Sequence, residues 1–228
     1  MEIVFSSLAN RFVLDNTINM FSDAYITIKD GEAAALIEKL NPLLDGASFD
    51  PMKAHILSHS LSFYNGYALC EVSDFDNVPV RSISFIYKEN GDFEEIHILD
   101  GTNNPIYHLN KAVPLFLNET NVISYARFFF YYVRGRFGRF NIVENVDEIN
   151  WREEPSPSGR KALSKMIQVL ELEKNAPEKT SFHMKCSIIF KDSLFESDIT
   201  VEENGNVSLS NQEMLVEDIP VLDDSFQQ

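Results

Sequence analysis

The stretch RSISFIYKENGDFEEIHI, residues 81–98, decides the class of fold. Asn90-Gly91 lies in its middle, and both residues tolerate the positive φ that a tight β-hairpin turn requires. A two-residue turn at this point places Phe85 opposite Ile96 and predicts two antiparallel strands. One face of this hairpin is then apolar, as an antiparallel sheet over a core requires. The side chains predicted on that face are Ile83, Phe85, Tyr87, Ile96 and Ile98.

A second dipeptide of the same kind, Asn204-Gly205, predicts another hairpin. A three-residue loop, 203–205, with glycine in the left-handed position would pair Val201 with Val207. A two-residue turn would pair Val201 with a serine instead. The apolar pattern therefore selects the three-residue loop.

Helical signals are fewer. Asp50-Pro51 is an N-cap residue followed by proline at the first helical position, and Asn41-Pro42 would end an alanine-rich helix. Asn121 and the serines around Pro157 are further caps. The expected helices are 31–40, 51–62, 122–133 and one from Ser156 or Ser158 to Leu170.

Strands that pair locally, with few helical crossovers, are typical of an α+β protein with mainly antiparallel sheet. The segment 153–159 is rich in Pro, Ser and Glu, so we expect it to be a linker. It would separate a main α+β domain, 1–152, from a small α+β subdomain with an acidic tail, 160–228. About 70 residues are marginal for an independent core, so we expect the subdomain to dock on the main domain.

The 228 residues are 44% hydrophobic and 24% charged, which is typical of a globular protein and excludes disordered and collagen-like classes. The N-terminal residues show no basic segment followed by a long apolar one, and no run of about 18 apolar residues occurs. Two cysteines, 116 positions apart, form no metal or redox motif. We therefore expect a cytoplasmic protein without a membrane partner.

The net charge is −16, and it is unevenly distributed. Residues 121–170 contain eight Lys or Arg and five Asp or Glu, net +3, between two acidic segments, 1–120 and 171–228. The overall charge repels phosphate backbones, so nucleic acid is not an expected partner. It favours solubility or a basic protein partner.

The basic island contains the candidate site, in NVISYARFFFYYVRGRFGRF, residues 121–140. Its helix is apolar on almost every side. Its polar exceptions are spaced so that they share one stripe, which consists of Ser124, Arg127, Tyr131 and Arg134. Arginines beside aromatic rings could hold a phosphate or carboxylate of a small ligand. The alternative is that Arg127 and Arg134 pair with carboxylates and hold the fold together. The expected ligand-binding side chains are Arg127, Tyr131, Arg134, Arg136 and Arg139.

Other motifs are weaker. His55 and His59 stand four residues apart on the expected helix, a spacing that metal sites use, but no third ligand is indicated. No nucleophile, phosphate-binding or dinucleotide motif occurs. We therefore expect no metal and no cofactor, and a non-catalytic binding or accessory protein with an acidic surface. The alternatives are an enzyme or sensor for a phosphorylated small molecule or nucleotide, and an acidic inhibitor that mimics nucleic acid.

Overall fold

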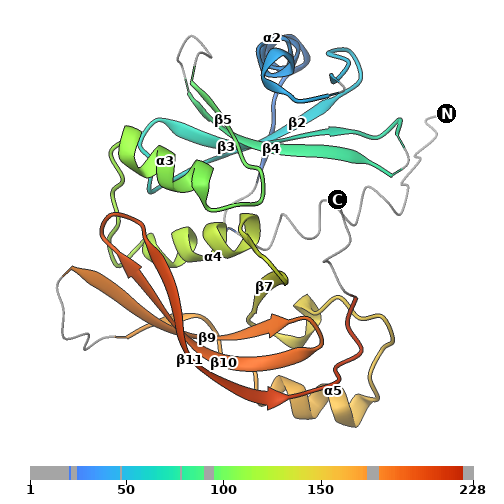
Figure 1. Cartoon of the computed structure of the whole chain (residues 1–228). Helices are drawn as coiled ribbons and strands as arrows, with labels where there is room; N and C mark the ends of the chain where they lie inside the picture. Colours follow the sequence, from blue (N-terminus) through green and yellow to red (C-terminus); the bar gives the residue numbers. More distant parts are fainter. Residues whose placement is uncertain are drawn as a thin grey trace. The chain divides into compact units, whose positions relative to one another are not determined.

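The computed structural model describes residues 21, 25–46, 48–77, 79–89, 95–173 and 180–222. Two antiparallel sheets and four α-helices make up this part of the chain, which confirms the α+β class (Figure 1). The chain divides into two compact units, Met1–Asp100 and Gly101–Gln228. The segment 153–159 lies within the second unit, and its role as a linker stays a prediction.

The first unit is a five-stranded meander with one helix over it. Its sheet has the order β1-β2-β3-β4-β5, and every pair is antiparallel. Helix α2 buries Ala33, Leu36, Ile37 and Leu40 in the same core as alternate side chains of the strands. The elements are β1 (Ile26–Thr27), α2 (Asp30–Leu40), the 3-10 helix η1 (Asn41–Leu43), β2 (His55–Ser60), β3 (Tyr67–Asp74), β4 (Arg81–Lys88) and β5 (Ile96–Ile98).

The β4–β5 pairing is confirmed, but its predicted register is wrong by two residues. Phe85 pairs with Ile98 instead of Ile96. A shift of two keeps every side chain on its face, so the predicted apolar face still lies in the core. The observed register brings Lys88 Nζ within 3.4 Å of a carboxylate oxygen of Glu95, a favourable cross-strand charge pair. The turn predicted at Asn90-Gly91 lies outside the described residues.

The helix predicted at 51–62 is wrong, because half of this segment, His55–Ser60, is strand β2. Asp50 and Pro51 begin only a turn, in which the Ala54 amide donates to the Asp50 carbonyl at 3.0 Å. From His55 onward the backbone pairs with β1 on one side and β3 on the other. Pairing with two strands, and the complete burial of Ile56 in the α2 core, outweigh the local capping signal.

The second unit places helices beside a larger sheet of order β11-β10-β9-β7-β6, with β8 paired to β9. Its elements are α3 (Asn104–Ala112), α4 (Val122–Tyr132), β6 (Arg134–Gly135), β7 (Gly138–Val143), the 3-10 helix η2 (Val146–Glu148), α5 (Pro157–Ser164), β8 (Glu171–Leu172), β9 (Ser181–Phe190), β10 (Ser193–Glu202) and β11 (Val207–Val216). One core cluster joins Val143, Ile189, Leu194, Ile219 and Val221, with Trp151 packed against it.

The β10–β11 hairpin confirms the predicted three-residue loop. Val201 pairs with Val207 and Ile199 with Leu209. Gly205 has a φ of +82°, and its amide donates to the Glu202 carbonyl at 2.8 Å. The apolar alternation of the two strands and the left-handed glycine of the loop therefore agree on this register.

Helix α5 begins where predicted but ends at Ser164, six residues early. Ser156 Oγ accepts from the Gly159 amide at 3.2 Å and caps the helix. The Gln168 amide then donates to Ser187 Oγ at 2.8 Å, and the Gln168 carbonyl accepts from the Ser187 amide at 3.1 Å. Bonds to β9 therefore replace the last helical turn.

Candidate functional site

Arg127 is held by an internal carboxylate. Helix α4 buries seven of its eleven residues, so a guanidinium on it needs an oppositely charged partner. Arg127 Nη2 lies 2.5 Å from Glu144 Oε2, with the two side chains 26% and 17% exposed. Glu144 Oε1 also accepts from the Leu170 amide at 3.3 Å. This residue therefore fits the structural alternative better than a ligand contact.

The predicted stripe through residue 134 is wrong, because α4 ends at Tyr132. Val133 is already extended, and Arg134 belongs to strand β6. The Arg134 amide donates to the Gly101 carbonyl at 2.7 Å, a bond that holds the chain in its new direction. Arg127 and Arg134 thus stand on different elements.

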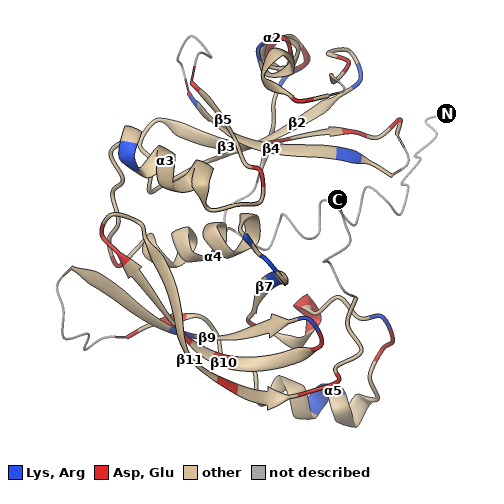
Figure 2. Cartoon of the chain, in the orientation of Figure 1, with Lys and Arg blue, Asp and Glu red and all other residues tan. Residues whose placement is uncertain are grey.

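Arg134, Arg136 and Arg139 meet instead on a tight hairpin, residues 134–139, which we name the arginine hairpin. Arg134 pairs with Arg139 and Gly135 with Gly138, so the turn consists of Arg136 and Phe137. Arg134, Arg136 and Phe137 are exposed, and Arg139 is half-buried. The basic residues of this segment lie together beside β7 (Figure 2).

Aromatic rings lie beside the guanidinium groups of Arg136 and Arg139. The Arg136 guanidinium carbon lies 5.5 Å from the ring centre of Phe137, whose side chain is 67% exposed. The Arg139 guanidinium carbon lies 5.4 Å from the ring centre of Tyr131, on α4. Both distances are within the range of cation–π attraction. Tyr131 therefore lies beside Arg139, and its role in ligand binding stays a prediction.

Glycines fix the base of the arginine hairpin against the sheet. A Cβ on Gly135 would lie 3.1 Å from the Phe140 ring and 3.2 Å from the Gly138 carbonyl oxygen. Gly138 has a φ of +139°, where an L side chain is strained. Phe140 stacks on Phe190 with ring centres 4.4 Å apart. Gly135 and Gly138 therefore allow the arginine hairpin to pack closely against Phe140 and Phe190.

Arg134 and Arg139 stand directly opposite each other on paired strands, so the hairpin gathers positive charge on a few residues. Guanidinium groups can donate two parallel hydrogen bonds to phosphate or carboxylate oxygens. Among the described residues, Arg136 has no carboxylate oxygen within ion-pair distance. The arginine hairpin is therefore chemically suited to an anionic group.

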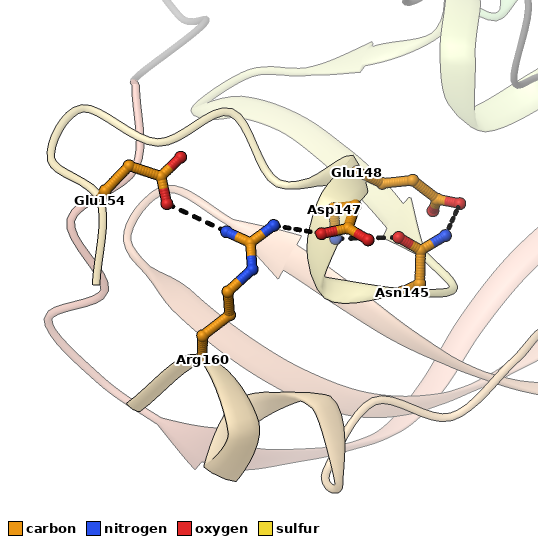
Figure 3. Close-up of polar contacts among 5 residues, drawn as sticks. All are labelled: Asn145, Asp147, Glu148, Glu154 and Arg160. Carbon is orange, nitrogen blue, oxygen red and sulfur yellow. Dashed lines mark hydrogen bonds and ion pairs between the residues drawn. The ribbon is translucent and has the colours of Figure 1, made fainter. Parts of the chain in front are cut away.

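Polar contacts connect several side chains of residues 145–160, which follow the arginine hairpin in the sequence (Figure 3). Arg160, on α5, bonds Glu154 Oε2 at 3.0 Å and also Asp147 Oδ1. The Asp147 amide donates to Asn145 Oδ1 at 2.8 Å, and the Asn145 side-chain amide donates to Glu148 Oε1 at 2.5 Å. The carboxylates of Asp147 and Glu154 therefore compensate the charge of Arg160.

Truncation of Arg127 tests its structural assignment. Arg127→Ala leaves the half-buried Glu144 carboxylate without its cationic partner. The free energy of unfolding should therefore fall by about 1–3 kcal/mol, which is less than the loss expected for a fully buried ion pair. Arg127→Lys should recover part of that loss, because a cation remains near the carboxylate. Urea unfolding followed by Trp151 fluorescence would measure both variants. An unchanged stability in Arg127→Ala would contradict the assignment.

The histidines do not form the expected helical pair, because both lie on strand β2. His59 is buried and stacks on Phe21 with ring centres 4.2 Å apart, whereas His55 is exposed. Cys70 and Cys186 are buried, and burial raises the pKa of each thiol to about 12. Neither thiol is therefore a thiolate nucleophile near neutral pH.

Four polar side chains on β9 and β10, which the sequence did not single out, lie together in the structure. Ser181 pairs with Glu202 and His183 with Thr200, so the four side chains share one face. The signal was present as polar residues at alternate positions of both strands, but only the strand register shows that the two pairs face each other.

Searches of protein-family models, curated proteins and solved structures find no match to this chain. Within the described residues, no helix is long and apolar enough to cross a membrane.

Proposed function

We propose that this chain is a non-catalytic binding protein that holds an anionic group of a small ligand at the arginine hairpin. The observation that carries the proposal is the cross-strand pairing of Arg134 with Arg139, with Arg136 at the turn between them. A phosphorylated small molecule fits this chemistry, because its oxygens accept paired bonds from guanidinium groups. Phe137 and Tyr131 offer ring faces beside the same cations.

The acidic remainder of the chain supports a second part of the proposal, a basic protein partner. The net charge of −16 attracts cationic surfaces at long range and repels large polyanions. A small phosphate ligand is repelled less than a nucleic acid, since it brings few charges. An accessory role, with a small anion at the arginine hairpin and a basic protein elsewhere, accommodates both features.

Pyrophosphate titration tests the anion site. We expect pyrophosphate at low ionic strength to shift the backbone amide resonances of residues 134–139 in a saturable manner. The double variant Arg134→Gln with Arg136→Gln should weaken this binding about tenfold or more, because each tenfold step corresponds to 1.4 kcal/mol and charge-assisted hydrogen bonds contribute about that much. Both side chains are exposed, so the fold should persist.

The double variant Arg152→Gln with Lys161→Gln is the matched control, since it removes the same two charges from exposed residues of the same unit outside the arginine hairpin. It should bind pyrophosphate as the unmodified chain does. Equal weakening in the control and in the variant of the arginine hairpin would mean that only general charge matters. Absence of any shift at residues 134–139 would overturn the proposed site.

A further inference from the structure

A cavity in the second unit shares no residue with the arginine hairpin. It has a volume of about 400 Å³, within the range of small-molecule sites. We name it the polar recess. Its lining consists of Thr180, Ser181, His183, Thr200, Glu202, Glu203 and Asn204.

Strand register builds the floor of the polar recess. The cross-strand pairs of Ser181 with Glu202 and His183 with Thr200 put four polar groups on one face. Val201, between Thr200 and Glu202, points the other way and is fully buried. Burial of Val201 therefore fixes which face of the strand carries Thr200 and Glu202, because the opposite orientation would expose apolar side chains.

His183 is fixed at the centre of this floor by two hydroxyl groups. Its Nε2 lies 3.0 Å from Ser181 Oγ, and its Nδ1 lies 3.2 Å from Thr200 Oγ1. A neutral imidazole donates at one nitrogen and accepts at the other, and each hydroxyl can complement either role. The ring thus has a defined orientation, and the hydroxyl oxygens keep lone pairs for a ligand.

Glu202 is held by the loop at one edge of the recess. Its Oε2 accepts from the side-chain amides of Asn204 at 3.0 Å and Asn206 at 2.9 Å. Glu203 is exposed beside it, and its backbone amide donates to the Thr180 carbonyl at 3.1 Å. The recess therefore contains two carboxylates, and none of the described residues that line it is Lys or Arg.

We propose that the polar recess binds a small organic cation, a primary ammonium group on a short aliphatic chain. An ammonium has three donors and no acceptor, which matches a lining of carboxylate, hydroxyl and amide oxygens. An anion is disfavoured by the two carboxylates. A metal ion is disfavoured too, because no group of three or more His, Cys, Asp or Glu ligands occurs among the described residues.

Three four-carbon probes separate charge from shape: 1,4-diaminobutane, the neutral 1,4-butanediol and the anionic succinate. We expect millimolar 1,4-diaminobutane to shift the NMR resonances of the His183 ring and the Thr200 amide in a saturable manner. The diol should produce much smaller shifts at the same concentration, and succinate none. Equal effects of diamine and diol would overturn the requirement for a cation.

Glu203→Gln keeps the shape of the side chain and removes one charge. It should raise the dissociation constant of the diamine about fivefold, the effect of about 1 kcal/mol for a partly exposed ion pair. Glu213→Gln is the control, because Glu213 is an exposed acid on β11 of the same sheet. Equal effects of the two variants, or equal shifts over the whole acidic surface, would show general counterion attraction and overturn the proposal.

Thr200→Val provides a second variant that leaves the net charge unchanged. It removes the hydroxyl at His183 Nδ1 while keeping a β-branched side chain suited to the strand. We expect weaker diamine binding together with a changed His183 ring resonance. Retention of full affinity in both Thr200→Val and Glu203→Gln would show that the recess is not the site. Because no arginine is altered, failure here leaves the pyrophosphate result unaffected.

Discussion

Gly205→Ala should destabilise the second unit by about 3 kcal/mol or more, from left-handed backbone strain and overpacking together. Gly205 has a φ of +82°, which an alanine adopts only with strain. A Cβ there would also collide with three neighbours: it would lie 2.6 Å from the Tyr125 hydroxyl and 2.7 Å from Leu115 Cδ2, and would contact the Asn110 side-chain amide. Urea unfolding followed by the fluorescence of Trp151, the single tryptophan, would measure the loss.

The reason for this sensitivity is that the β10–β11 loop is docked on helices α3 and α4. Tyr125 donates its hydroxyl hydrogen to the Gly205 carbonyl at 2.7 Å, and Asn110 donates to the Tyr125 oxygen at 2.9 Å. The Val207 amide donates to the Tyr107 hydroxyl at 3.3 Å. An added methyl group would therefore disrupt a hydrogen-bonded contact between sheet and helices.

Gly101→Ala separates backbone strain from crowding. Gly101 has the same φ of +82° in the same unit, but the nearest atom to its added Cβ is Arg134 Cδ at 3.8 Å, an ordinary contact. We expect this control to cost only the backbone strain, about 1–2 kcal/mol. Equal losses in the two variants would contradict the crowding at Gly205.

Phe85→Ala should lower the stability of the first unit by about 3–5 kcal/mol, the usual cost of removing a buried aromatic ring. Phe85 is 0% exposed and lies in the core formed with α2. Its strand neighbours are Cys70 on β3 and Ile98 on β5, so the cavity would open in the middle of the sheet. Hydrogen exchange of the β3 amides under native conditions would report the loss.

Met52→Ala is the control for this substitution, because Met52 in the same unit is 88% exposed. Its removal should change the exchange of the β3 amides by no more than about 0.5 kcal/mol. A similar effect of both variants would mean that Phe85 does not lie in the core.

The arginine site shows where sequence reasoning succeeds and where it stops. The composition of residues 121–140 singled out the arginines of the hairpin and Tyr131, since charge and aromatic content are local properties, and their role as a site stays a prediction. The spacing that placed Arg134 on a helical stripe failed, because α4 ends at Tyr132 and the next residues pair as β6 and β7. Nothing in the local spacing reports that Glu144 lies beside Arg127.

The sequence by itself determined the α+β class, the β10–β11 register and the N-terminal boundary of α5. These features depend on apolar alternation, on Asn-Gly turn chemistry and on helix capping, which act over a few neighbouring residues. Tertiary structure decided that 55–60 is a strand, that β4 and β5 pair two residues out of the expected register, and that Ser181, His183, Thr200 and Glu202 share one recess. In these cases hydrogen bonds and burial against segments distant in the sequence outweigh local preference, because the free energy of a strand lies in the partners it pairs with.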